Sequence, residues 1–193
     1  MKNLPALCIL ISAVLCLHPL DAQTFSWDLM FLKGRESIPI SRMISKKTGD
    51  EFSIFITPST DCFLYVIARD SEDNYSVLFH DPLRGGQTKK IGEEDRAWMI
   101  GDPPGTETLY VIMSQKRQQR MEDRIKSFNE NPGSIRSIDN LREELARLQE
   151  EASGLGQPGV AFVPGGGSSR GNQEYVSRFS EKDMYVRPIR IQH

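Results

Sequence analysis

The sequence of 193 residues has only three cysteines and three histidines, and its charges nearly cancel, with 24 basic and 26 acidic side chains. A chain so close to neutral has no overall field to attract nucleic acid or an anionic membrane surface. Cys62, His80 and His193 are scattered and lack the regular spacing of zinc ligands. Cys62 also lies in an apolar run, where a thiol is normally buried and inert. We therefore expect no nucleic-acid partner, no metal and no cofactor.

The first 22 residues are typical of a secretory signal peptide. Lys2 supplies a positive charge, residues 4–17 form an apolar run, and Ala22 is a small residue suited to cleavage. The run is short for a bilayer span, so a membrane anchor or a buried amino-terminal helix is the less favoured alternative. The sequence thus predicts a periplasmic or secreted protein with no membrane span after cleavage. Cys62 would then be its only cysteine, and a secreted chain without an internal disulfide depends on a packed core.

Residues 50–114 contain the densest β-branched and aromatic runs, broken by turn residues at short intervals. This pattern predicts antiparallel strands. Residues 62–68 are apolar on both faces, which indicates a central strand between two layers. Further strands are expected at 51–57, 75–79 and 106–114, and in the extended patterns at 24–47, 175–179 and 184–191. Pro39 and Pro188 favour edge positions or bends.

The hydrophobic period changes after Ser114, where two amphipathic helices are predicted. The first lies within 115–128, and the second begins at Ile138 with Ser137 as its cap and ends near Ser153. Their apolar stripes consist of Met121, Ile125 and Phe128 in the first helix and of Ile138, Leu141, Leu145 and Leu148 in the second. Together they form an αα-hairpin whose stripe should pack on the sheet, with partner binding through the stripe as an alternative.

The expected architecture is a mainly β domain over residues 23–193, a two-layer antiparallel β-sandwich (Ig-like) with a helical insertion at 115–153. Strands from both ends of the chain would complete the two sheets. Roughly 170 mature residues suit one domain of ordinary size. The glycine-rich segment 164–172 is expected to be a flexible loop, because it lacks the lysine and the strand–loop–helix context of a phosphate-binding loop.

Two acidic features resemble functional sites but favour structural roles. Asp70, Glu72 and Asn74 imitate the start of an EF-hand loop, yet Tyr75 occupies the position that needs glycine, so a solvated hairpin tip is expected. Glu107 begins a strand with no second carboxylate evident beside it, which favours a structural role over general acid catalysis.

Several spaced motifs occur in a characteristic order. They are Thr48-Gly49-Asp50, residues 61–66, Val77-Leu78-Phe79, and residues 103–107 leading into 109–114. This order resembles the bacterial domain of unknown function 4384, whose pattern is a glycine–aspartate turn, a "YLY" strand, an "LFP" strand and a "GTE" strand. The resemblance covers residues 46–114 well and extends more loosely to residue 193. It implies an extracytoplasmic, mostly β accessory or binding domain with no assigned catalysis, and it supplies no catalytic residues.

The chain departs from that family pattern at two places. Phe63 stands where the first tyrosine is usual, and His80-Asp81-Pro82 replaces the usual proline–asparagine.

The predicted function is that of a non-catalytic binding or assembly component of the bacterial cell envelope, with a protein partner. One alternative is a module that binds envelope glycan through the exposed aromatics Tyr75, Trp98 and Tyr110. The other alternative is a hydrolase with paired carboxylates, since a site built from distant acids leaves no mark in the sequence.

Overall fold

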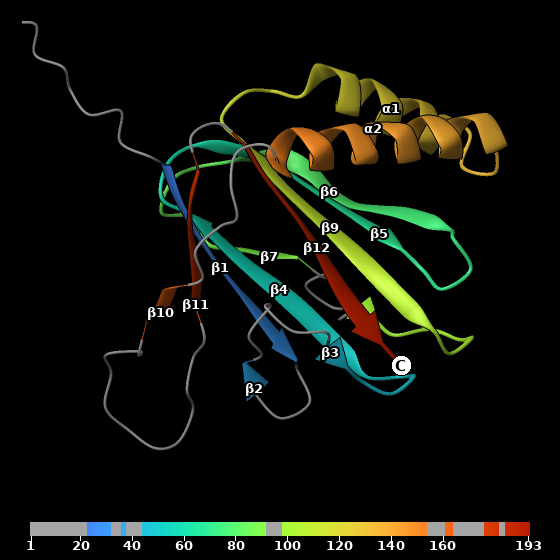
Figure 1. Cartoon of the computed structure of the whole chain (residues 1–193), viewed down its shortest axis with the longest axis horizontal. Helices are drawn as coiled ribbons and strands as arrows, with labels where there is room; N and C mark the ends of the chain where they lie inside the picture. Colours follow the sequence, from blue (N-terminus) through green and yellow to red (C-terminus); the bar gives the residue numbers. More distant parts are fainter. Residues whose placement is uncertain are drawn as a thin grey trace, which may run out of the picture.

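The computed structural model describes residues 23–31, 36–37, 44–91, 98–153, 161–163, 176–181 and 184–193. The expected signal peptide at 1–22, Pro39 and the glycine-rich loop at 164–172 lie outside these residues. The described segments form two β-sheets and two helices (Figure 1).

Sheet A has the strand order β10-β11-β1-β4-β7, with β2 pairing with β1 and β8 pairing with β4. Its strands are β1 (Gln23–Phe31), β2 (Glu36–Ser37), β4 (Glu51–Pro58), β7 (Lys89–Ile91), β8 (Trp98–Met99), β10 (Ala161–Val163) and β11 (Val176–Glu181). Sheet B has the order β3-β12-β9-β5-β6. Its strands are β3 (Ile44–Ser45), β5 (Cys62–Arg69), β6 (Tyr75–Leu83), β9 (Thr106–Ser114) and β12 (Met184–Gln192).

Segments from both ends of the chain complete the sheets, as predicted. In sheet A, β1 lies between β11 and β4, and in sheet B, β12 lies between β9 and β3. Pro188 sits opposite Tyr110 of β9, while β3 reaches only Ile191 and Gln192. The outer side of β12 at Pro188 therefore has no paired strand among the described residues, which confirms the edge position. The β3–β12 pair is parallel, so the expectation of all-antiparallel pairing was wrong at this point.

The turns between strands follow from their sequences. Gly49 has a φ of 83°, which the Thr48-Gly49-Asp50 turn before β4 requires and which glycine adopts without a steric penalty. Asp73 has a φ of 65° at the tip between β5 and β6. Left-handed backbone was expected in this hairpin, since Asp and Asn tolerate it better than most residues.

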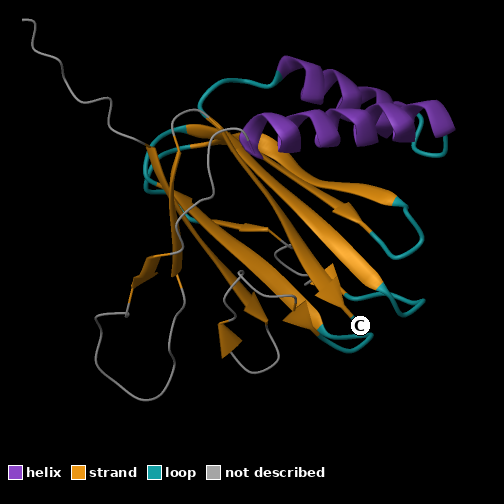
Figure 2. Cartoon of the chain, viewed as in Figure 1, coloured by secondary structure: helices purple, strands orange, loops and turns teal. Residues whose placement is uncertain are grey.

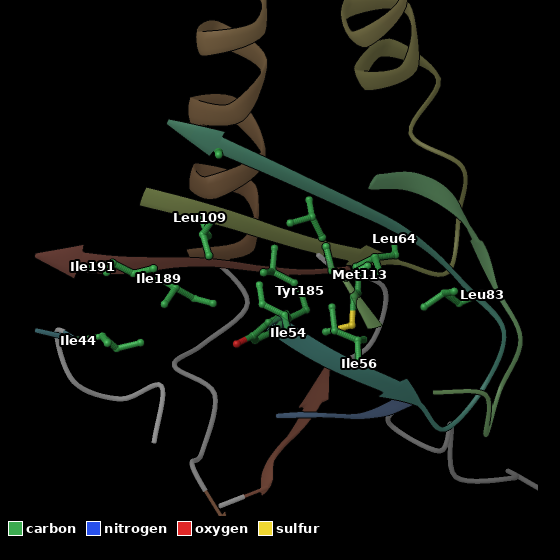
Figure 3. Close-up of a cluster of buried hydrophobic side chains, with 14 of the residues drawn as sticks. Ile44, Ile54, Ile56, Leu64, Leu83, Leu109, Met113, Tyr185, Ile189 and Ile191 are labelled. Carbon is green, nitrogen blue, oxygen red and sulfur yellow. The ribbon is translucent and has the colours of Figure 1, made fainter. Parts of the chain in front are cut away.

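The space between the sheets is filled by one apolar cluster. Ile54 and Ile56 of β4 point toward Leu64, Met113 and Tyr185 of sheet B (Figure 3). Alternate residues of β5 join this cluster because successive side chains of a strand point to opposite faces. Cys62 is one of them and is only 3% exposed, which confirms its predicted burial.

The helices cover the other face of sheet B (Figure 2). α1 (Gln119–Glu130) and α2 (Ile135–Ser153) place their predicted stripes on a second buried cluster. From the sheet this cluster takes Tyr65, Ile67, Tyr75, Tyr110, Ile112 and Met184. The stripe is thus occupied within the chain, which confirms packing on the sheet over partner binding through the stripe. Ile138 is only partly buried.

Two predicted boundaries were wrong. α2 begins at Ile135, so Ser137 is a buried residue of its first turn rather than its cap. The cause is local, because the Ile138 N–H already donates to the Ser134 carbonyl at 3.0 Å. β6 continues to Leu83, past the predicted end at Phe79. Pro82 is tolerated there because β6 is an edge strand, where a missing N–H removes no ladder bond.

The structure confirms a mainly β fold with an αα-hairpin. Within the described part of the chain, neither helix has the length and apolar character that crossing a bilayer would require.

Candidate binding groove between α1 and the edge strand β6

A groove with a volume of about 800 Å³ runs between α1 and β6. The sheet contributes Phe63, His80, Asp81 and Pro82. The helical side contributes Arg117, Glu122, Asp123, Ile125, Lys126 and Glu130, among others. The groove thus combines a small apolar floor, at Phe63 and Pro82, with charged walls.

Strand pairing explains why His80 and Pro82 face the helix. Residues directly opposite each other in an antiparallel pair share one face of the sheet. His80 lies opposite Tyr65, and Pro82 lies opposite Phe63. Tyr65 belongs to the cluster beneath the helices and Phe63 packs against it. His80 and Pro82 are therefore on the helix side of sheet B, next to α1.

A hydrogen-bond network fixes the start of α1 at one end of the groove. The Tyr65 hydroxyl donates to Glu122 Oε1 at 3.1 Å and accepts the N–H of Gln118 at 3.0 Å. Arg117 Nε donates to Glu122 Oε2 at 2.6 Å. Burial raises the pKa of Tyr65 to about 12, so its hydroxyl stays protonated and able to donate at neutral pH. Glu122 is consequently engaged by two partners and serves to hold the helix.

The remaining charges of the groove leave an acidic surplus. Glu122 is neutralised by its ion pair with Arg117. Asp123 and Glu130 are exposed, and Lys126 is the basic group that faces them in the groove. Asp81 also borders the groove, but it lies opposite Leu64 of the inter-sheet cluster, so its side chain is on the other face of sheet B. Asp123 accepts a hydrogen bond from Gln119 Nε2 at 3.1 Å, an interaction that leaves its negative charge in place.

A second, smaller hollow of about 390 Å³ adjoins the groove, since both are lined by Phe63 and Pro82. It also contains Cys62, Asp61 and Arg84. Burial, with a contribution from the nearby Asp61 carboxylate, raises the pKa of the Cys62 thiol to about 11. The thiol is therefore protonated at neutral pH and a poor nucleophile.

The aromatic residues that the sequence suggested as a ligand surface are placed differently. Tyr75 and Tyr110 are 7% and 8% exposed and lie in the cluster beneath the helices. The Arg142 guanidinium further covers the Tyr75 ring, 5.9 Å from its centroid. The expectation that these two rings are exposed was wrong, because α1 and α2 cover the face of sheet B from which they project. Trp98 lies in β8, and its side chain is outside the described residues.

Glu107 is buried but lines neither hollow. It accepts the Gly101 N–H at 3.3 Å, and Oε1 lies 3.5 Å from His193 Nε2. Burial raises the pKa of Glu107 above its ordinary value, although the Gly101 hydrogen bond and His193 act in the opposite direction. These contacts tie the end of β12 to the turn before β9, which fits the structural role predicted for this residue.

The Asp70 carboxylate accepts hydrogen bonds from residues of its own hairpin. Its Oδ1 accepts the N–H groups of Glu72 at 2.9 Å and Asn74 at 2.8 Å, and its Oδ2 accepts Asn74 Nδ2 at 2.9 Å. These bonds hold the β5–β6 hairpin tip. Among the described residues there is no group of three or more His, Cys, Asp or Glu side chains placed to hold a metal ion.

Residues 46–117 match the family described as a domain of unknown function (DUF4384). The resemblance inferred from the motif order is confirmed over this segment. No curated protein and no solved structure matches the chain. The matched segment contains β4 to β9 and therefore the strand wall of the groove, whereas α1 begins at Gln119, just after the match ends. The groove thus forms where the DUF4384 segment meets the helical hairpin that follows it.

Sequence reasoning weighed His80 as a zinc ligand and noted His80-Asp81-Pro82 as a departure from the family pattern, but it missed the groove itself. That departure was the available signal, because it placed a proline and two polar residues where the strand wall now lies. The α1 wall left no such signal in the sequence, because α1 comes to lie beside β6 only when the helical hairpin packs on the sheet.

Proposed function

We propose that the chain is a non-catalytic binding component that holds a protein partner in the groove between α1 and β6. The observation that carries this proposal is the pairing of an edge strand with a charged helix flank around a small apolar floor. Extended segments commonly bind at such edges, where main-chain groups give affinity and flanking pockets give specificity.

The non-catalytic part of the proposal rests on the state of the candidate reactive groups. Glu122 is held by Tyr65 and Arg117, and the Cys62 thiol is kept protonated by burial. Glu107, the described carboxyl whose pKa burial raises, lies outside the groove. A general acid or base would have to reach a bound substrate from within the groove.

The cell envelope is the proposed place of action. This part is supported by Lys2, the apolar run at 4–17 and Ala22, which together suit an exported chain. Amino-terminal sequencing of the protein released from cells should give a start after Ala22. A start at Met1 would contradict export by cleavage.

Site-specific photo-crosslinking tests the binding proposal. A photoreactive phenylalanine replaces Asn129, an exposed residue of the groove, and a matched variant carries it at Glu143, an exposed residue of α2 that does not line the groove. Irradiation of expressing cells should link the first variant to a discrete protein and leave the second unlinked. Equal products from both positions, or none from position 129, would contradict the proposal. A product containing carbohydrate would favour the glycan alternative instead.

A further inference from the structure

We infer that the partner is an extended segment with lysine or arginine side chains, which lies along β6 as an additional strand and faces the acidic flank of α1. This inference rests on the proposed function and adds the chemistry and the binding mode of the partner.

The outer side of β6 is open for main-chain pairing. β6 is the last strand of sheet B and pairs only with β5 among the described residues (Figure 1). Pro82 lies opposite Phe63 and has no N–H to donate to β5. The Phe63–Pro82 pair therefore fits a non-hydrogen-bonded pair, in which the main-chain groups of the β6 residue point away from β5. Hydrogen-bonded and non-hydrogen-bonded pairs alternate along antiparallel strands, which directs the N–H and C=O of His80 outward as well. A partner strand would find a donor at His80 and acceptors at His80 and Pro82.

A register shift limits how far such a strand can extend. The β5–β6 pairing is regular from Leu83 to Phe79 and shifts between Val66 and Ile67 of β5. The regular stretch coincides with the part of β6 that lines the groove. One short partner segment could therefore pair with the open main-chain groups of β6 and contact the charged flank of α1 at the same time.

The charges of the groove select a basic partner. Asp123 and Glu130 of α1 face the groove with Lys126 as their counterpart, so a segment with positive side chains gains attraction and an acidic one meets repulsion. Phe63 and Pro82 provide an apolar floor along which the alkyl stems of lysine or arginine can lie. Since side chains of a strand alternate, basic residues at every second position would all face α1.

Other occupants fit these observations less well. An anionic lipid surface or a nucleic acid would meet the same acidic surplus. A second copy of this chain would bring the same acidic surplus to its partner in place of basic side chains, so it lacks the charge complementarity that the groove offers.

The test uses the full chain and a capped nine-residue peptide of alternating valine and lysine. One matched peptide carries glutamate in place of lysine, and another carries N-methyl groups on alternate amides, which remove main-chain donors but keep the charges. Binding is measured by fluorescence anisotropy and by amide chemical shifts of the protein. The lysine peptide should bind and shift the His80 amide, whereas the other two peptides should bind at least about tenfold more weakly.

Protein variants separate the groove from general charge effects. The double substitution D123N/E130Q should weaken lysine-peptide binding about two- to thirtyfold, as expected for two exposed charge pairs. E143Q/E150Q removes the same charge from exposed positions of α2 outside the groove and should leave the affinity unchanged. These surface variants keep the buried contacts of both helices, and a matching melting temperature for all three proteins verifies this.

The inference is overturned by equal binding of the glutamate peptide, by equal binding of the N-methylated peptide, or by equal weakening in the two double variants. It is also overturned if the free protein dimerises and the lysine peptide fails to dissociate the dimer. If the peptide does not bind but position 129 still crosslinks to a discrete protein, the proposed function stands and only this binding mode falls. If neither result is obtained, both fall.

Discussion

The Tyr65 hydroxyl donates to Glu122 Oε1 at 3.1 Å, and this bond joins the centre of sheet B to the first turn of α1. The same oxygen accepts the Gln118 N–H, one of the main-chain donors that a helix start cannot satisfy by itself. A single side chain of the sheet therefore completes the helix start and holds Glu122, which lines the groove.

Tyr65→Phe should lower the free energy of unfolding by about 1–3 kcal/mol, because it leaves the Gln118 N–H and one Glu122 oxygen without this partner. Urea denaturation measures the loss. A double-mutant cycle with Glu122→Gln should give a coupling energy of about 0.5 kcal/mol or more. Strictly additive effects would show that the bond contributes nothing to holding α1.

Glu144→Gln should destabilise the helical hairpin. The Glu144 side chain has no exposed surface and lies 2.8 Å from Arg120 Nε of α1 and 2.7 Å from Arg147 Nη2 of α2. Removing its charge should cost about 1–3 kcal/mol, less than for a fully buried pair because both arginines remain partly hydrated. Thermal and urea unfolding check this value.

The adjacent exposed residue supplies the control for that experiment. Glu143→Gln removes the same charge from the same helix and should change stability by less than about 0.5 kcal/mol. Equal effects at the two positions would mean that the Glu144 ion pairs do not hold the helices together.

The raised pKa of Glu107 should make stability fall as the pH rises above 4.5, the ordinary value for this carboxyl. Below that value Glu107 is protonated in both states, and its contribution is fully present. As the pH rises, the unfolded chain loses the proton first, so the folded state binds more protons and is progressively disfavoured until the folded pKa is passed. Unfolding curves between pH 4 and 8 should show this decline and a smaller one in Glu107→Gln. Parallel curves would contradict it.

Cys62 should react slowly in the native protein. With a pKa of about 11 it carries roughly a hundredth of the thiolate of an ordinary cysteine at pH 8, and its side chain is buried as well. In a chain with Cys8 and Cys16 replaced by serine, an aromatic disulfide reagent should modify Cys62 quickly only after denaturant is added. Rapid labelling without denaturant would show that the strand end opens readily.

Leu145→Ala should cost about 2–5 kcal/mol, because it removes buried volume between α2 and sheet B. Ile135 is 77% exposed on the same helix, and Ile135→Ala should change stability by less than about 0.5 kcal/mol. Urea unfolding of both variants gives the comparison. Similar losses would indicate that the hairpin is not tightly docked.

The sequence predicted those features that depend on neighbouring residues. The β5 run with apolar residues on both faces indicated a strand between two layers, and Cys62 is indeed buried in it. The spacing of Met121, Ile125 and Phe128 indicated one face of a helix, and all three are buried. These patterns are read from short segments because the periods of strand and helix decide which side chains share a face.

The remaining features depend on how distant segments meet. Tyr75 and Tyr110 carry no local sign of burial, and it is the docked hairpin that covers them. The continuation of β6 through Pro82 depends on its place at the edge of sheet B, which no local pattern encodes. The groove depends both on the packed hairpin and on the edge position of β6. Its walls could therefore not be recognised before α1 and β6 were placed side by side.

β12 pairs with both β9 and the short strand β3 in sheet B, yet it follows every other described strand in the sequence. During synthesis β9 emerges long before β12, so the ribosome must complete residues 184–192 before these two strands can pair. The intervening chain has to close a long loop, which slows the formation of such contacts. A growing polypeptide therefore keeps one flank of β9 unpaired until residues 184–192 have left the ribosome.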